Sequence, residues 1–444
     1  MPTNETEPDT QARTGPDSPP TAKGARPKTV IVAAVALGFV IALMSSSIKN
    51  TVSVFYVPMS HDFSVSRGTF ALAPSVFMLT YAIASPVLGF AADRIGARRS
   101  LAGGLVLGGA MFLAGGVVSS FALFSVVYGV GLAIAYTAVS YVPLGVLVDE
   151  LFPPHRRGLT YAILMNGTAV GFIALVPLWI YVEHSTSWRT VFIVLGVVMV
   201  ALMLLSLIFL PGENRAPEET AQTAEQAGRA TGEERTTGGA AAPARGGMFG
   251  AVLRSSVFWT VSLAFVGCGV TMSFVDVHLV ASLDSHGLGG GTASTTMAIL
   301  GAAEIVGSLI AGYLCDRGHG LKVLAGCYLI RALSLVVMAV APTVLTAWVF
   351  GLLFGISYMG TVVAGSMYLL NSLDPRAKGL ALGMMWCLHQ IGAFVASEAG
   401  GLSFDALHSY DPVVIGAAAC AGLSFLIVVT ALPKALRKAN PTHA

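Results

Sequence analysis

Twelve apolar stretches, each long enough to cross a lipid bilayer, dominate this sequence. A helix of about 20 apolar residues spans a hydrocarbon core about 30 Å thick. Only 11% of the residues are charged, against about 25% in soluble proteins, which excludes a soluble protein. The chain is predicted to be an all-α membrane protein of twelve transmembrane helices in two six-helix bundles, with helices at 29–50, 70–91, 100–119, 122–147, 158–181, 188–210, 256–283, 292–315, 323–341, 343–370, 379–401 and 413–432.

Polar segments divide the chain. An Ala, Gly, Thr and Glu-rich stretch at 211–247 has almost no large apolar residues and is typical of a flexible linker. The first residues are polar and lack the apolar core of a signal peptide, which predicts a disordered tail. The expected organisation is a tail at 1–28, an N-terminal bundle at 29–210, a linker at 211–253, a C-terminal bundle at 254–433 and a tail at 434–444.

Basic residues collect in the tails and in alternate loops. Only Lys49, Arg67, Arg189 and Arg331 lie elsewhere. The positive-inside rule therefore predicts that both termini and the linker are cytoplasmic. Charges spread over many short loops indicate topology and not a nucleic-acid patch, so no nucleic-acid partner is expected.

A charged turn, GFAADRIGARR at 89–99, follows the second apolar stretch. It returns as GYLCDRGHG after the eighth stretch, with Asp316 and Arg317 in place of Asp93 and Arg94. A second pattern repeats at 221 residues: Gly158 pairs with Gly379. Such offsets predict two homologous halves related by duplication. The residues of interest in the two turns are Gly89, Asp93, Arg94, Gly96, Arg98, Arg99, Asp316 and Arg317.

Over about 29–433 the chain resembles the major facilitator superfamily, with 89–99 matching its loop between helices 2 and 3. Within that superfamily it is similar to the monocarboxylate porters and oxalate/formate exchangers. The similar segments are FYVPMSHDFSVSRGTF, Trp188-Arg189 and FVDVHLVASLDSHG. The resemblance implies two bundles that rock around a midplane site and open alternately to each side.

The charged turns are then expected to form a cytoplasmic gate. A carboxylate at a helix N-terminus is favoured by the helix dipole, and the nearby arginines are expected to pair across the bundle interface. The alternative is that the loop only sets topology and caps a helix.

Glu304 should lie near mid-membrane, where an ionisable residue is a functional candidate. In the monocarboxylate porters, an acid here precedes a substrate-binding arginine by one helical turn. In this chain that position is Ser308. Glu304 is expected to be a proton or substrate site, or to form a structural ion pair with Arg331.

Lys49 and Asn50 lie in the outer part of the first helix, where the same family has a functional lysine. Either could face an anionic substrate, or Lys49 could extend to the outer interface. Asp276 and His278 are their rough counterparts in the seventh helix, and their spacing puts at most one of them toward the cavity.

Other polar groups lie within apolar runs. Tyr136 and Tyr358 occupy equivalent mid-membrane places and are expected to contact substrate, with packing between helices as the alternative. Asn166, His389 and Gln390 are candidates for substrate contact or for interhelical hydrogen bonds.

Further chemistry is not indicated. No C-x-x-C pair, nucleotide-binding motif or nucleophile–base set is present, so no metal, cofactor, disulfide framework or enzymatic activity is expected. The expected protein is a monomeric secondary active transporter of the plasma membrane. It would be coupled to protons and move a small organic solute, with a monocarboxylate-like anion favoured.

Two alternatives remain. One is drug or metabolite efflux, although Val127-Tyr128 stands where helix 4 of that family carries an arginine. The other is a transport-inactive solute sensor, although such proteins usually carry a large cytoplasmic domain.

Overall fold

The structure is a computed structural model that describes residues 28–70, 72–183, 185–210 and 245–439. This described part is helical, with twelve helices long and apolar enough to cross a membrane. The prediction of twelve spans is therefore confirmed. The expected tail at 1–27, most of the expected linker and the last residues, 440–444, lie outside the described residues.

The first half contains six spans. They are formed by the helices α1 (Lys28–Val54), α4 (Leu72–Ile95), α5 (Ala97–Val117), α6 to α8, α9 (Arg157–Glu183) and α10 (Trp188–Phe209). The fourth span consists of α6 (Phe121–Val126), a π-helical segment η1 (Val127–Leu132), α7 (Ala133–Val139) and α8 (Tyr141–Leu151). Shorter elements are α2 (Tyr56–Asp62), α3 (Arg67–Phe70) and the 3₁₀ turn η2 (Pro154–Arg156).

The second half repeats the pattern. Its spans are α13 (Ser256–Ser273) with the π segment η3 (Phe274–His278) and α14 (Leu279–Ser285), then α15 (Gly290–Asp316), α16 (Gly320–Val340), α17 (Val344–Ser372), α18 (Lys378–Leu407) and α19 (Asp411–Ala439).

Several helix ends differ from the prediction, and two of them fall at expected domain boundaries. Helix α12 (Arg245–Arg254) begins inside the segment expected to be a linker, and α19 continues past 433 to Ala439. Helix α12 is a short separate helix before α13, and the end of α19 is basic sequence that continues a span, so neither is marked by hydropathy.

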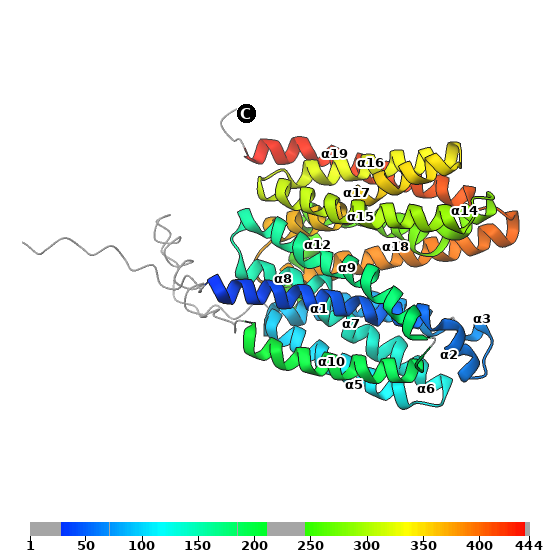
Figure 1. Cartoon of the computed structure of the whole chain (residues 1–444). Helices are drawn as coiled ribbons and strands as arrows, with labels where there is room; N and C mark the ends of the chain where they lie inside the picture. Colours follow the sequence, from blue (N-terminus) through cyan, green and yellow to red (C-terminus); the bar gives the residue numbers. More distant parts are fainter. Residues whose placement is uncertain (1–27, 71, 184, 211–244, 440–444) are drawn as a thin grey trace, which may run out of the picture.

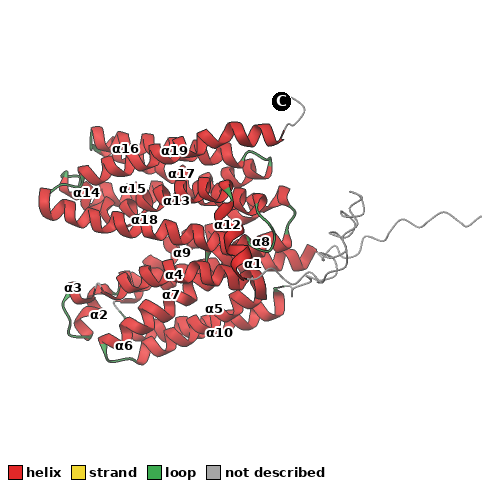
Figure 2. Cartoon of the chain, turned by 180° about the vertical axis from the view of Figure 1, so that it is seen from behind, coloured by secondary structure: helices red, strands yellow, loops and turns green. Residues whose placement is uncertain are grey.

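The helices form two bundles (Figures 1 and 2). In the first, α1 packs on α9 and α5 on α10; in the second, α15 packs on α17 and α13 on α18. Across the interface, α4 contacts α18 and α9 contacts α15. We call the end where α1 begins and α10 ends the linker face, on the left in Figure 1, and the opposite end, with α2, α3 and α14, the distal face.

Helix α4 illustrates how the sequence orients these helices. Leu79, Ile83 and Val87 are about 60% exposed, at 60%, 62% and 63%, and form one stripe at helical spacing. The opposite side, with Tyr81 and Ser85, is buried. An apolar stripe facing outward with polar groups inside is expected for a helix solvated by lipid.

Candidate functional site

Asp93 crosses the bundle interface at the linker face. Its Oδ1 accepts a hydrogen bond from the backbone N–H of Gly379 at 2.7 Å, and its Oδ2 accepts one from Leu380 at 2.8 Å. These N–H groups open α18 and have no partner within that helix. The carboxylate also lies at the positive end of the helix dipole, so it is doubly favoured there.

Asp316 makes the same contact in the other direction. It accepts from the N–H groups of Gly158 at 2.6 Å and Leu159 at 2.9 Å, at the start of α9. Glycines permit this approach: a Cβ on Gly89 would overlap the carbonyl oxygen of Gly379, and one on Gly312 would approach that of Gly158 at 2.6 Å. The two halves therefore cap each other's helices.

The arginines of the two turns differ from expectation. Arg94 stacks on Phe90 at 4.5 Å and Arg317 on Tyr313 at 4.3 Å, each within its own helix. Arg98 donates to the carbonyl oxygen of Leu207 in its own bundle. The expected pairing of arginines across the interface is therefore wrong for these three residues, because the aspartates reach backbone amides instead. Of the remaining turn residues, Gly96 adopts a left-handed φ of 81°, and Arg99 is exposed.

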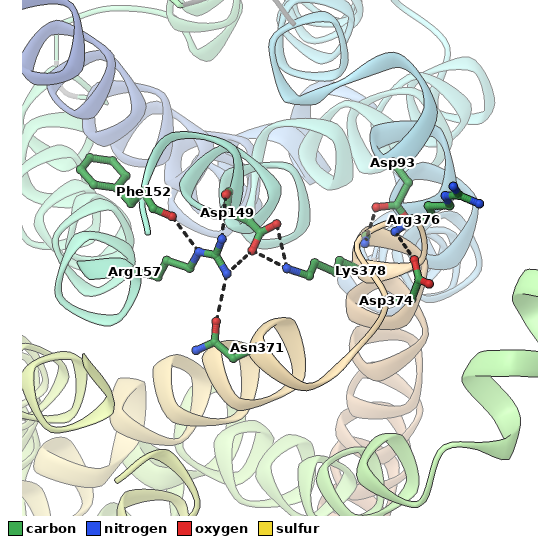
Figure 3. Close-up of polar contacts among 9 residues, drawn as sticks. Asp93, Asp149, Phe152, Arg157, Asn371, Asp374, Arg376 and Lys378 are labelled. Atoms are coloured by element: carbon green, nitrogen blue, oxygen red, sulfur yellow. Dashed lines mark hydrogen bonds and ion pairs between the residues drawn. The ribbon is translucent and has the colours of Figure 1, made fainter. Parts of the chain in front are cut away.

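A second polar network lies beside Asp93 (Figure 3). Asp149, at the end of α8, forms ion pairs with Arg157 at 2.7 Å and with Lys378 of the other bundle at 2.8 Å. Arg157 also donates to Asn371 of the other bundle at 3.1 Å. Sequence reasoning assigned Arg157 and Lys378 only to topology, and passed over Asp149 and Asn371.

Three candidates converge nearer the distal face. Lys49 of α1 lies 3.4 Å from the Oδ2 of Asp276 in η3, and the Tyr358 hydroxyl donates to Oδ1 of the same carboxylate at 2.9 Å. The ion pair joins the two bundles, and its side chains are 47% and 37% exposed. The pair is therefore only partly buried. Asn50, next to Lys49, is half-buried.

Glu304 of α15 is 8% exposed. The expected ion pair between Glu304 and Arg331 is not present among the described residues. Among the described residues the Arg331 guanidinium bonds to neutral groups of α13 and α17. Ser308, one turn after Glu304, donates to the Oδ1 of Asn166 in α9 at 2.8 Å, an interhelical bond across the interface.

The remaining candidates pack between helices. His278 turns away from Lys49 and contacts the carbonyl oxygen of Ser397 at 2.9 Å. His389 bonds to Gln390 at 2.9 Å. Tyr136 is buried, with its ring 5.2 Å from that of Tyr81.

An aromatic contact lies between this cluster and the linker face. Tyr141 of α8 stacks on Trp386 of α18 with ring centroids 4.1 Å apart. Tyr81 and Phe265 also flank Trp386. Sequence reasoning missed Tyr141 and Trp386, since aromatic residues in apolar runs look like ordinary lipid-facing or core residues. Within the described residues no three His, Cys, Asp or Glu side chains gather as metal ligands.

The family model for the Major Facilitator Superfamily matches residues 35–397. The chain belongs to the Major Facilitator Superfamily. The chain is 30% identical to a Bacillus subtilis protein described as uncharacterized MFS-type transporter YcxA. The match covers 91% of this chain and 96% of that protein. Monocarboxylate transporter 12-B of Danio rerio is 26% identical, covering 84% of this chain and 80% of that protein.

Solved structures of the superfamily share this fold. The structure of the proton:xylose symporter XylE matches with a TM-score of 0.72 at 15% identity, covering 90% of this chain and 96% of that one. Members of the Major Facilitator Superfamily are transporters and not enzymes. This chain is therefore a multi-pass membrane transporter built on the major facilitator fold.

Proposed function

We propose that this transporter carries a small monocarboxylate-like anion together with a proton by alternating access. The observation that supports it best is the Lys49–Asp276 ion pair, which joins the two bundles and is half open to solvent. A substrate carboxylate can take the place of Asp276 at Lys49. The resemblance to monocarboxylate transporters supports the same choice.

Charge balance supports proton coupling. Lys49 pairs with Asp276, and the second bundle buries a further acid and base, Glu304 and Arg331. These four groups carry two positive and two negative charges, so the set is neutral when all are ionised. A bound monocarboxylate leaves one excess negative charge at a depth where charge is costly. One proton on Asp276 or Glu304 restores neutrality, which favours electroneutral cotransport.

Alternating access accounts for the placement of the contacts. The carboxylate-to-amide bonds of Asp93 and Asp316 join the bundles at the linker face, which we assign to the cytoplasm of a plasma-membrane protein. The ion pair nearer the distal face is exposed. This arrangement fits a state that receives solute from the distal side, with the Tyr141–Trp386 stack as the floor of the path. Inward opening would break the linker-face bonds.

The test is uptake into proteoliposomes of labelled lactate, pyruvate and oxalate and of a cationic dye. Each is measured with an imposed pH gradient and, separately, with an imposed membrane potential. We expect a monocarboxylate to accumulate with the pH gradient and to respond little to the potential. Accumulation of the dye alone would overturn the substrate class and favour drug efflux.

Glu304→Gln tests the coupling residue. We expect it to abolish stimulation by the pH gradient, because an amide cannot carry the proton, while substrate exchange without net proton movement continues. Glu398→Gln is the matched control, since Glu398 is exposed on α18. Full pH stimulation in Glu304→Gln would remove Glu304 from the coupling role.

A further inference from the structure

Arg331 is the largest fully buried side chain of the described residues, with no exposed surface. It lies on α16, whose other side presents Leu329, Leu333 and Val336 outward, with exposures of 41%, 53% and 46%. A guanidinium on the inner side of such a helix is taken out of water completely, so it must be compensated within the protein.

The guanidinium joins two neighbouring helices. On α17 it donates to the carbonyl oxygens of Ser357 at 2.7 Å and Tyr358 at 2.9 Å, and to the hydroxyl of Thr361 at 2.9 Å. On α13 it donates to the hydroxyl of Thr271 at 3.2 Å and to the sulfur of Cys268 at 3.1 Å. Its planar fork of donors suits contacts to several acceptors at once.

These two helices carry the polar groups that face Lys49. Arg331 holds the backbone of Tyr358 itself, whose phenol donates to Asp276. Its bond to Thr271 lies just before η3, the π-helical segment that contains Asp276. Because a π turn departs from regular helix spacing, the anchor before it helps to set the direction in which Asp276 points.

We propose that Arg331 is a positioning residue for the site formed by Lys49, Asp276 and Tyr358. It clamps α13 and α17 so that Asp276 and Tyr358 meet Lys49. The residue acts through its neighbours, and its side chain does not contact the solute. The transport consequence of this inference rests on the proposed function, whereas its structural content does not.

The experiment measures how fast the Lys49 amine is modified by reductive methylation. The intact, purified transporter is labelled, and the modification of each lysine is then read by mass spectrometry of its peptides. An ammonium group engaged by Asp276 reacts slowly, so Asp276→Asn should raise the Lys49 rate about threefold, as expected for a partly exposed pair. Lys322 is exposed and serves as the internal reference in every sample.

Arg331→Lys keeps the positive charge but loses the fork of donors. We expect it to raise the Lys49 rate by part of the Asp276→Asn effect, and to add nothing when Asp276 is already Asn. Thr271→Val, which removes one acceptor and is milder for folding, should shift the rate in the same direction by less. Arg331→Lys and Thr271→Val that both label at the wild-type rate would overturn the proposal, as would an undiminished effect in the Asp276→Asn background.

This readout needs no knowledge of the solute. If the labelling follows expectation but no carboxylate is taken up in proteoliposomes, the positioning role stands and the proposed substrate fails. If a carboxylate is transported, Arg331→Lys should raise its KM more than it lowers kcat, because the site still forms but is less well ordered.

Discussion

The linker face and the group of Lys49, Asp276 and Tyr358, which we call the central cluster, use the internal repeat in opposite ways. At the linker face the same contact is present twice. Asp93 caps α18 and Asp316 caps α9, and in both cases the carboxylate oxygens accept hydrogen bonds from backbone N–H groups. In the central cluster the two halves contribute unlike groups, with the cation Lys49 from one bundle and the carboxylate Asp276 from the other. Only one copy of this pair is present among the described residues.

This difference separates two roles of the halves: the contacts that change as the bundles move, and the site that selects the solute. Contacts that must make and break as the bundles move can remain symmetric, because both halves take part in the same motion. A site that selects one solute has no need for symmetry, since the solute is not symmetric. The comparison predicts that paired substitutions act alike at the linker face.

The largest effect is expected at two glycines where backbones of the two bundles cross closely. Gly89→Val and Gly312→Val should each reduce the initial uptake rate by about a hundredfold, because a side chain at either site overlaps backbone of the other bundle and cannot move aside. Gly103→Ala is the control, since Gly103 has open space beside it. Normal uptake in either valine variant would show that the crossing does not matter for transport.

An intermediate effect is expected at the capping aspartates. Asp93→Asn and Asp316→Asn each weaken two charge-assisted hydrogen bonds, each worth about 1.5 kcal/mol or more. Each should lower the thermal unfolding midpoint in detergent by a similar amount. Asp374→Asn, at an exposed loop residue, controls for loss of charge. A large drop for one capping variant and none for the other would break the symmetry argument.

The smallest effect tests an asymmetric detail of the same face. Asn371→Asp places a second carboxylate beside Arg157, whose Nη1 lies 3.1 Å from the present Oδ1. The added ion pair should hold the bundles together and slow maleimide labelling of Cys315, which is buried against Gly158, by about twofold to threefold.

Cys315→Ala confirms the labelled site in that experiment, and Asn371→Ala separates the added charge from the lost amide. Faster labelling in Asn371→Asp would mean that the carboxylate draws Arg157 away from Asp149 and loosens the face.

Sequence predicted the architecture well because lipid imposes a simple rule on span length and polarity. The repeat of Asp93 and Asp316 was visible for the same reason, since charged residues stand out in apolar sequence. Their partners were not visible: they are backbone N–H groups, which every residue except proline carries. The expectation that arginines would pair across the interface failed at this point.

The central site could be predicted only in part. Lys49, Asp276 and Tyr358 were each singled out, but not as one cluster, because their helices are joined only by tertiary packing. The stack of Tyr141 on Trp386 could not be predicted, because aromatic residues within apolar stretches do not stand out in the sequence. The expected pair of Glu304 with Arg331 did not form because the inward-facing guanidinium bonds to hydroxyl, carbonyl and sulfur atoms of α13 and α17, and the sequence does not reveal these neighbours.

The reciprocal capping described above has a consequence for biosynthesis. The first half is synthesised with the start of α9 still lacking the carboxylate that Asp316 supplies, and α18 in turn requires Asp93 from the half already in the membrane. Each half thus supplies the capping carboxylate for a helix of the other half. Two separately translated fragments, divided between 210 and 245, would carry complementary ends and the means to recognise one another.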